Sequence, residues 1–278
     1  MTEDMGRDGI PVEFRAFVDR AMRRTLDLGA GAALLLVGSR GAGYHDDTSD
    51  LDLWIVGDRE RLTPDEAREY GSTGQVFADR GDYEAHWTFY DAADLADQFR
   101  AGHDERLWTF LNSRAIAGDD ARVAAMRCEF ARYPPPVAEA KLRWLMGRVL
   151  AVKGALRHAR RGDPATTVAV AAEIAQCLWK MCCLAERGPF PYSKWLARAA
   201  SETRMGRSLC ARIDRAMTQV GEIVALPDVT THREWTPVRE LEACIEQAPS
   251  ILRELGWDEE WLDNPTPAIA AAMAGPMP

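Results

Sequence analysis

The sequence predicts an α+β protein in which a small mixed sheet flanked by helices is followed by an all-helical bundle. Short apolar runs that are typical of buried strands lie in the first third of the chain and stop after Asp91. Beyond that point helical periodicity takes over. Three consecutive prolines, at 134–136, cannot continue a helix and mark the expected boundary. We therefore expect two domains, residues 1–133 and 134–278.

The first domain is expected to hold one helix and four strands. Apolar residues recur at helical spacing between Pro11 and Gly29, with proline at the start and glycine at the end. Glycine and polar residues fill 39–49, which is typical of a surface connection. The four runs expected as strands are 32–37, 51–56, 75–78 and 83–90.

Long helices are expected throughout the second domain. Four helical patterns follow the prolines, and the third is open to a break near Gly206. The tail from Asn264 is rich in proline and alanine, so we expect it to be loosely packed. The four helices are expected at 136–161, 164–187, 191–222 and 236–255.

The composition disfavours several classes of protein. Hydrophobic residues make up 47% of the 278 residues, which is enough to build a core and argues against a disordered chain. The net charge of −9 lacks the basic footprint of a nucleic-acid binder and favours cationic partners such as metal ions. No uninterrupted run approaches the roughly 18 apolar residues that cross a membrane, and the first residues lack the pattern of a signal peptide. We therefore expect a cytoplasmic protein that binds neither nucleic acid nor a membrane.

Two aspartates separated by one residue open the second expected strand. Because alternate residues of a strand share a face, Asp50 and Asp52 are expected side by side, while Leu51 and Leu53 anchor the opposite face in the core. Neighbouring carboxylates repel each other unless a divalent cation lies between them. Mg²⁺ prefers such oxygen ligands together with substrate phosphates. We therefore expect Asp50 and Asp52 to bind Mg²⁺.

Gly38 and Ser39 end the first expected strand. A glycine allows close approach of the backbone, and backbone N–H groups together with a hydroxyl can hold phosphate oxygens. The glycines at 38, 41 and 43 fit the spacing of neither a dinucleotide-binding loop nor a P-loop. The pattern indicates a site for a polyphosphate beside the metal that bridges it.

A strand ending in Gly38 and Ser39, about ten connecting residues, and Asp50-Leu51-Asp52 together resemble the signature of the polymerase-beta-like nucleotidyltransferases. Within that superfamily the sequence is most similar to antibiotic nucleotidyltransferases, the aminoglycoside adenylyltransferases, in which a helical bundle follows the catalytic domain. The likeness is strong only over residues 32–56. It implies Mg²⁺-dependent transfer of a nucleoside monophosphate, in first place AMP from ATP, to a hydroxyl of a small aminoglycoside-like molecule. Pyrophosphate would be released, and the activity would confer antibiotic resistance.

The resemblance also implies a third carboxylate. In that family it follows the aspartate pair on a later strand, and Glu84 lies on the polar face of the strand expected at 83–90. The resemblance gives Glu84 one of two roles, either the general base that takes the proton from the acceptor hydroxyl or a third metal ligand. Asp82 and His86 share the expected face and are the alternatives.

Two cations complete the expected site. The segment Pro191-Tyr192-Ser193-Lys194 is similar to the lysine-bearing segment by which those enzymes bring a positive charge to the triphosphate, so Lys194 is the candidate. Arg40, directly after Ser39, is a second candidate. Either cation would stabilise the charge of the leaving pyrophosphate.

Two alternative functions stay open at this point. A toxin-type nucleotidyltransferase would use the same chemistry on RNA or protein, although the lack of a basic patch argues against RNA. A regulatory protein of the same fold would bind a nucleotide without turnover. The acceptor, the position modified, the preferred nucleobase and the oligomeric state are not specified by any motif.

Overall fold

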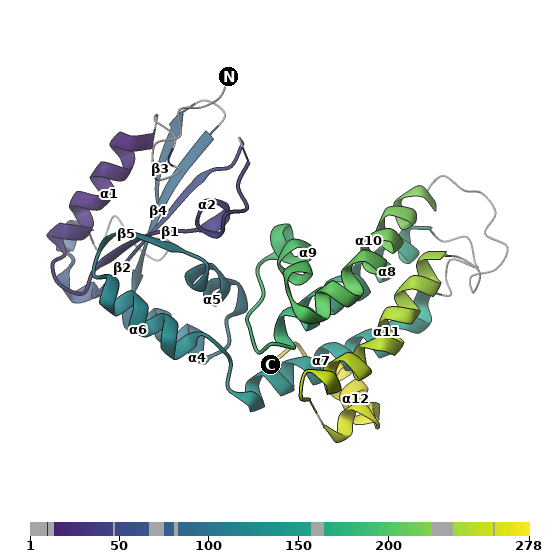
Figure 1. Cartoon of the computed structure of the whole chain (residues 1–278). Helices are drawn as coiled ribbons and strands as arrows, with labels where there is room; N and C mark the ends of the chain where they lie inside the picture. Colours follow the sequence, from purple (N-terminus) through teal and green to yellow (C-terminus); the bar gives the residue numbers. More distant parts are fainter. Residues whose placement is uncertain are drawn as a thin grey trace. The chain divides into compact units, whose positions relative to one another are not determined.

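The structure is a computed structural model that describes residues 10, 14–46, 48–66, 75–80, 83–156, 164–223, 236–257 and 259–278. The chain divides into two compact units, Met1–Ala131 and Arg132–Pro278, which are described separately (Figure 1). The two units meet between Ala131 and Arg132, two residues before the boundary expected between residues 133 and 134. The assignment of separate functions to residues 1–133 and 134–278 stays a prediction.

The first unit is a five-stranded mixed sheet with helices. Strand order is β3-β4-β2-β1-β5; β2 and β4 run parallel, and the other neighbours are antiparallel. The predicted α+β class is confirmed. The elements are α1 (Arg15–Asp27), β1 (Ala33–Leu36), α2 (Gly38–Ala42), β2 (Leu51–Gly57), η2 (Arg59–Arg61), β3 (Gln75–Arg80), β4 (Tyr83–Asp91), α4 (Ala92–Arg100), α5 (Asp104–Leu111), β5 (Arg114–Gly118) and α6 (Asp120–Phe130).

One face of this sheet packs against α1. All four residues of β1 are buried, while burial in β4 alternates so that Trp87 and Phe89 join the core. Phe17 of α1 stacks on Trp87 with ring centroids 5.0 Å apart. Burying each large apolar side chain contributes roughly 1.5–3 kcal/mol, so this layer holds the strands in register.

The other face carries aromatic side chains toward the carboxyl end of β2. Trp54 lies 4.5 Å from Tyr90 of β4, measured between ring centroids. Arg106 of α5 lies over the Tyr90 ring, and Phe99 of α4 packs on Phe110 of α5. This face is therefore apolar at one end of β2.

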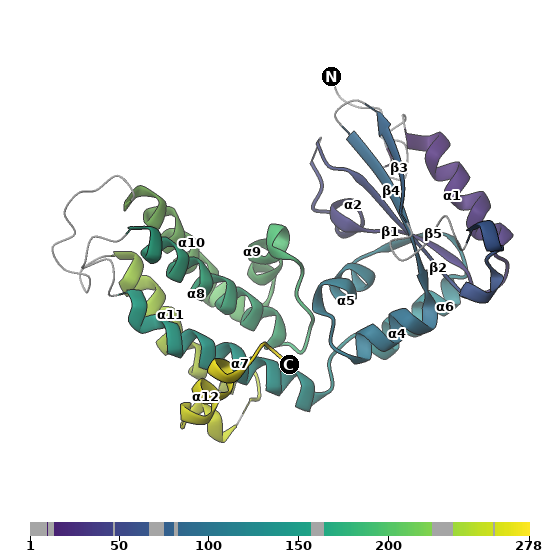
Figure 2. The ribbon, with the colours of Figure 1, turned by 180° about the vertical axis from the view of Figure 1, so that it is seen from behind.

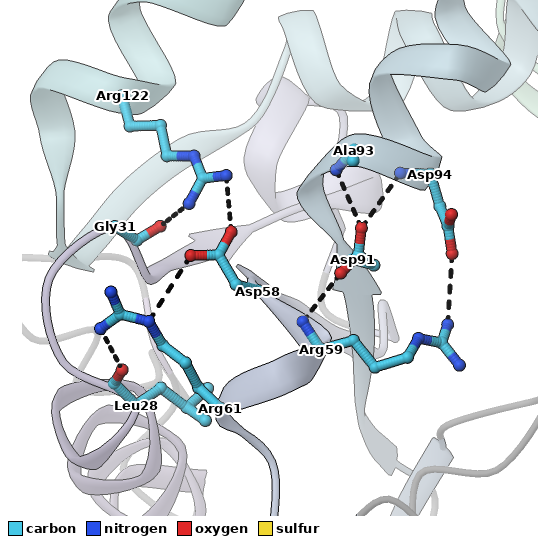
Figure 3. A network of polar contacts seen from close by, with 9 residues as sticks. All are labelled: Leu28, Gly31, Asp58, Arg59, Arg61, Asp91, Ala93, Asp94 and Arg122. Carbon is cyan, nitrogen blue, oxygen red and sulfur yellow. Dashed lines mark hydrogen bonds and ion pairs between the residues drawn. The ribbon is translucent and has the colours of Figure 1, made fainter.

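A polar network closes the carboxyl ends of β2 and β4 (Figure 3). Asp58 accepts a hydrogen bond from Arg122 at 2.8 Å and pairs with Arg61 at 3.5 Å. The same two guanidinium groups donate to carbonyl oxygens between α1 and β1. Asp91 accepts from the amide of Arg59 at 2.7 Å and from two first-turn amides of α4. Burial opposes ionisation of Asp91, but these amide hydrogen bonds bring the pKa of its carboxyl below the ordinary value.

Two elements of the first unit differ from the expectation. The start of the 39–49 connection forms the short helix α2, which ends where Gly43 takes a left-handed φ of 72°. The chain also returns to the sheet after Asp91 as β5, an edge strand paired with β1. Its sequence, Arg-Ala-Ile-Ala-Gly, has one β-branched residue and an exposed start, so the apolar pattern of a strand is missing.

The second unit is a bundle of helices (Figure 2). Helix α8 packs against α7, α9, α10 and α11. The expected third helix is divided at Thr203, where the backbone is extended. This break lies three residues before Gly206. The elements are α7 (Pro135–Val152), α8 (Pro164–Leu184), α9 (Ser193–Glu202), α10 (Arg204–Ile223), α11 (Thr236–Glu254), η4 (Glu260–Leu262) and α12 (Thr266–Ala274).

The expectation of a loosely packed tail is wrong. Helix α12 lies against α7, with Ala268 and Ala272 buried. A Cβ on Gly147 of α7 would clash with the carbonyl group of Ala268, so the absence of a side chain lets the two helices approach. Alanine is the best helix former, and small residues allow this contact.

Helix α8 is both long and apolar. Among the described residues, its segment Ala165–Leu184 is the one helix long and apolar enough to cross a membrane by length and composition, and 56% of its apolar stretch is buried inside the structure. Burial of this extent is typical of a core helix. The cytoplasmic location stays a prediction.

Candidate functional site

The amino ends of β2 and β4 lie side by side because the two strands are parallel. Leu51 is in register with Ala85, and Asp52 is in register with His86. The backbone N–H of Glu84 donates to Oδ1 of Asp50 at 3.4 Å. The structure therefore brings Asp50 and Glu84 together across the two strands. We call Asp50, Asp52 and Glu84 the carboxylate edge.

Burial separates the two faces of β2 at this edge. Leu51 and Leu53 are 0% and 1% exposed and belong to the α1-facing core. Asp50 is exposed, and Asp52 is half-buried. Alternation along the strand therefore places the two aspartates on the face opposite the core. Leucine burial fixes this orientation, because a slip of one residue would bury the carboxylates.

Gly38 lies directly against the carboxylate of Asp52. Its φ is +63°, and a Cβ added there would stand 2.5 Å from Oδ2 of Asp52. The amide of Val37 donates to the carbonyl of Asp52 at 2.9 Å, which ties the end of β1 to β2. Ser39 is 4% exposed, and its carbonyl accepts from the amide of Tyr44 at 2.8 Å. Gly38 thus adjoins the carboxylate edge, and Ser39 follows it as a buried residue of α2.

His86 is the neighbour that sequence reasoning left as an alternative. Its Nε2 lies 3.3 Å from Oε2 of Glu84, and its side chain is 18% exposed against 64% for Glu84. The alternation along β4 signals this contact, since both residues lie on its polar face. The other alternative, Asp82, lies outside the described residues.

The two predicted cations lie in different surroundings. Arg40 is 6% exposed and donates to the backbone carbonyls of Ser49 and Asp50. Lys194 belongs to the second unit, where it is exposed near the start of α9 with Nζ 5.0 Å from the ring centroid of Trp195. A role of either residue in binding a triphosphate stays a prediction.

The chemistry of the carboxylate edge suits a hard cation. Carboxylate oxygens are the ligands that Mg²⁺ prefers, and substrate phosphates and water usually complete its shell. Among the described side chains, no group of three or more His, Cys, Asp or Glu stands close enough to hold a metal. The roles of Asp50, Asp52 and Glu84 as metal ligands therefore stay a prediction.

The chain shows only limited similarity to known proteins. A family model described as "Domain of unknown function (DUF4037)" matches residues 99–196, which include parts of both units. No curated protein matches the chain. Among solved structures, the chain is similar to a nucleotidyltransferase-like protein from Exiguobacterium sibiricum, with 9% identity and a TM-score of 0.46 over 92% of this chain and 90% of that one.

Proposed function

We propose that this protein is a nucleotidyltransferase that transfers a nucleoside monophosphate, AMP from ATP in first place, to a hydroxyl of a small molecule with release of pyrophosphate. The observation that carries the proposal is the carboxylate edge, where Asp52 lies at the start of β2, Asp50 directly precedes the strand, and the backbone N–H of Glu84 in β4 donates to the Asp50 carboxylate. Gly38, packed against Asp52, adds the expected phosphate-binding segment.

In this mechanism the residues of the edge divide three tasks. Asp50 and Asp52 would hold Mg²⁺, which when bound supplies positive charge to the phosphate oxygens. Glu84 would accept the proton of the acceptor hydroxyl as that oxygen attacks the α-phosphorus in line. Gly38 and Ser39 would hold the phosphates, so that the bond to pyrophosphate breaks opposite the incoming oxygen.

The acceptor is proposed as a small hydroxylated molecule of aminoglycoside type. The sequence resemblance is the basis for this class. The net charge of −9 is compatible with a cationic acceptor, because an acidic protein attracts cations from solution. If aminoglycosides are the acceptors, expression of the chain should raise resistance of a bacterial host to them.

The test is an acceptor screen with defined variants. Purified full-length protein is mixed with Mg²⁺, each of the four nucleoside triphosphates, and a panel of aminoglycosides and other polyols, and pyrophosphate is measured. Asp50→Asn and Asp52→Asn should each lower kcat by more than about 10²-fold, because metal-held charge stabilisation amounts to several kcal/mol. Asp94→Asn removes an exposed carboxylate at the other end of the sheet and should leave kcat unchanged.

Full activity in either Asn variant of the pair would refute the proposed site. Labelled nucleotide retained on denatured protein or RNA would instead identify the toxin-type activity.

The role of Glu84 is decided by a separate variant. Glu84→Gln keeps the size of the side chain and removes its charge, so loss of a general base should lower kcat by roughly 10²–10⁴-fold. Binding of Mg²⁺ and ATP, measured by calorimetry, should change little in that case. A large loss of metal affinity would identify Glu84 as a ligand instead.

A nucleotide-binding regulator is the second candidate. The observation that favours it is that the side chain of the proposed general base, Glu84, is 64% exposed and pairs with His86 at 3.3 Å. Calorimetry would then detect binding of a nucleotide while no acceptor mixture yields pyrophosphate.

A further inference from the structure

Arg40 is a buried charge beside the candidate site. Its Nη2 donates to the carbonyl of Ser49 at 2.7 Å, and its Nε lies 3.2 Å from the carbonyls of both Ser49 and Asp50. The residue is only 6% exposed. A buried guanidinium is costly unless it is hydrogen-bonded, and charge-assisted bonds to carbonyls are strong. These contacts therefore define where the side chain lies.

The segment that Arg40 holds is itself a tight turn. Oδ1 of Asp46 accepts hydrogen bonds from the amide and the hydroxyl of Thr48 and from the hydroxyl of Ser49. The amide of Ser49 donates to the carbonyl of Asp46 at 3.2 Å. The turn ends at Ser49, and the next residue is Asp50. Arg40 therefore donates to the backbone carbonyls at the junction between the turn and β2.

We propose that Arg40 is a positioning residue that fixes the backbone of Asp50 and thereby the place of the Asp50 carboxylate at the carboxylate edge. The inference rests on the proposed function. Asp50 itself is exposed and lies one residue before β2, so the ladder of β2 does not restrain it as it restrains Asp52. Two donor nitrogens of one planar group restrain two successive carbonyls, which the single ammonium of a lysine cannot do in the same geometry.

A positioning role and direct contact with a triphosphate predict changes in different kinetic constants of an Arg40 variant. A misplaced Asp50 should lower kcat, because displacements near 1 Å can cost roughly 10²-fold in rate, while KM for ATP changes little. Direct contact with the bound triphosphate would instead appear in KM for ATP.

The experiment compares Arg40→Lys with the matched control Arg122→Lys. Arg122 likewise donates to a backbone carbonyl, that of Gly31, and it also donates to the carboxylate of Asp58, at the opposite end of β2. Both variants are measured for unfolding free energy, for kcat and KM of the wild-type reaction, and for hydrogen exchange in peptides containing residues 48–52 without any substrate. The kinetics are run well below the unfolding temperature of each variant.

Arg40→Lys should lower kcat by about 10²-fold with KM for ATP nearly unchanged and should speed exchange in residues 48–52. Arg122→Lys should keep the wild-type kcat and the wild-type exchange in that segment. An Arg40→Lys protein with unchanged kcat, or with a raised KM for ATP as its main defect, overturns the inference. If the wild type binds and transfers no nucleotide, the proposed function fails. The exchange data then still decide whether Arg40 orders the segment, and unchanged exchange refutes that too.

Discussion

Replacing Gly38 with alanine should reduce activity strongly while the chain still folds. The added Cβ would stand 2.5 Å from Oδ2 and 3.3 Å from Cγ of Asp52. To reach 3.4 Å, the near limit of ordinary contact, Oδ2 must retreat by about 0.9 Å. If Asp52 is a metal ligand as proposed, a shift of that size in its carboxylate should lower kcat by roughly 10²-fold. The left-handed φ of +63° adds a backbone cost of about 1–2 kcal/mol to the free energy of unfolding.

Gly43→Ala separates the two effects. Gly43 also has a left-handed φ, +72°, but an added Cβ there meets nothing within 4 Å. The two variants should therefore lose similar unfolding free energy in a urea titration, and only Gly38→Ala should lose kcat in the pyrophosphate assay. Equal activity of both variants would show that the approach of Gly38 to Asp52 does not position the carboxylate.

Three further predictions concern stability and reactivity. Asp91→Ala should cost roughly 0.5–2 kcal/mol of unfolding free energy at pH 7, and because the folded pKa of Asp91 is lowered, this difference should shrink as the pH falls below the ordinary carboxyl pKa of about 3.9. Gly147→Ala should lower the stability of the second unit by about 1–3 kcal/mol through overpacking against α12, whereas Gly154→Ala, with open space around it, should not. A thiol reagent should modify the exposed Cys128 in the native protein and the other five cysteines only after unfolding, since these are buried and burial raises the pKa of Cys177 to about 11. The first expectation fails if the loss of unfolding free energy in Asp91→Ala is the same at pH 7 and below about pH 3.9. The second fails if Gly147→Ala is as stable as the wild type. The third fails if several cysteines of the native protein are labelled rapidly.

The strands of the first unit could be predicted because burial leaves a regular pattern. The continuous apolar run of β1 and the alternation around Trp87 are the patterns of fully buried and half-buried strands. The same alternation predicts that Asp50 and Asp52 share a face. The contact between Asp50 and Glu84 depends on the parallel pairing of β2 with β4, which a local pattern does not specify.

Other features depend on contacts between distant segments. β5 is held by backbone pairing with β1, so its side chains carry little signal. Helix α12 packs because Gly147, more than a hundred residues earlier, leaves room for it. The burial of Arg40 follows from its reach to the carbonyl of Ser49, while its sequence position beside Ser39 indicates only proximity to phosphate.

The row of side chains along one face of β2 changes from acid to aromatic within a few residues. Trp54 follows Asp52 on that face, is 9% exposed, and lies against Tyr90. A cation at Asp52 would therefore lie one position along this face from a largely buried ring. Attraction between opposite charges is screened less where water is excluded, so binding of such a cation should depend less on ionic strength than binding to a fully hydrated pair of aspartates.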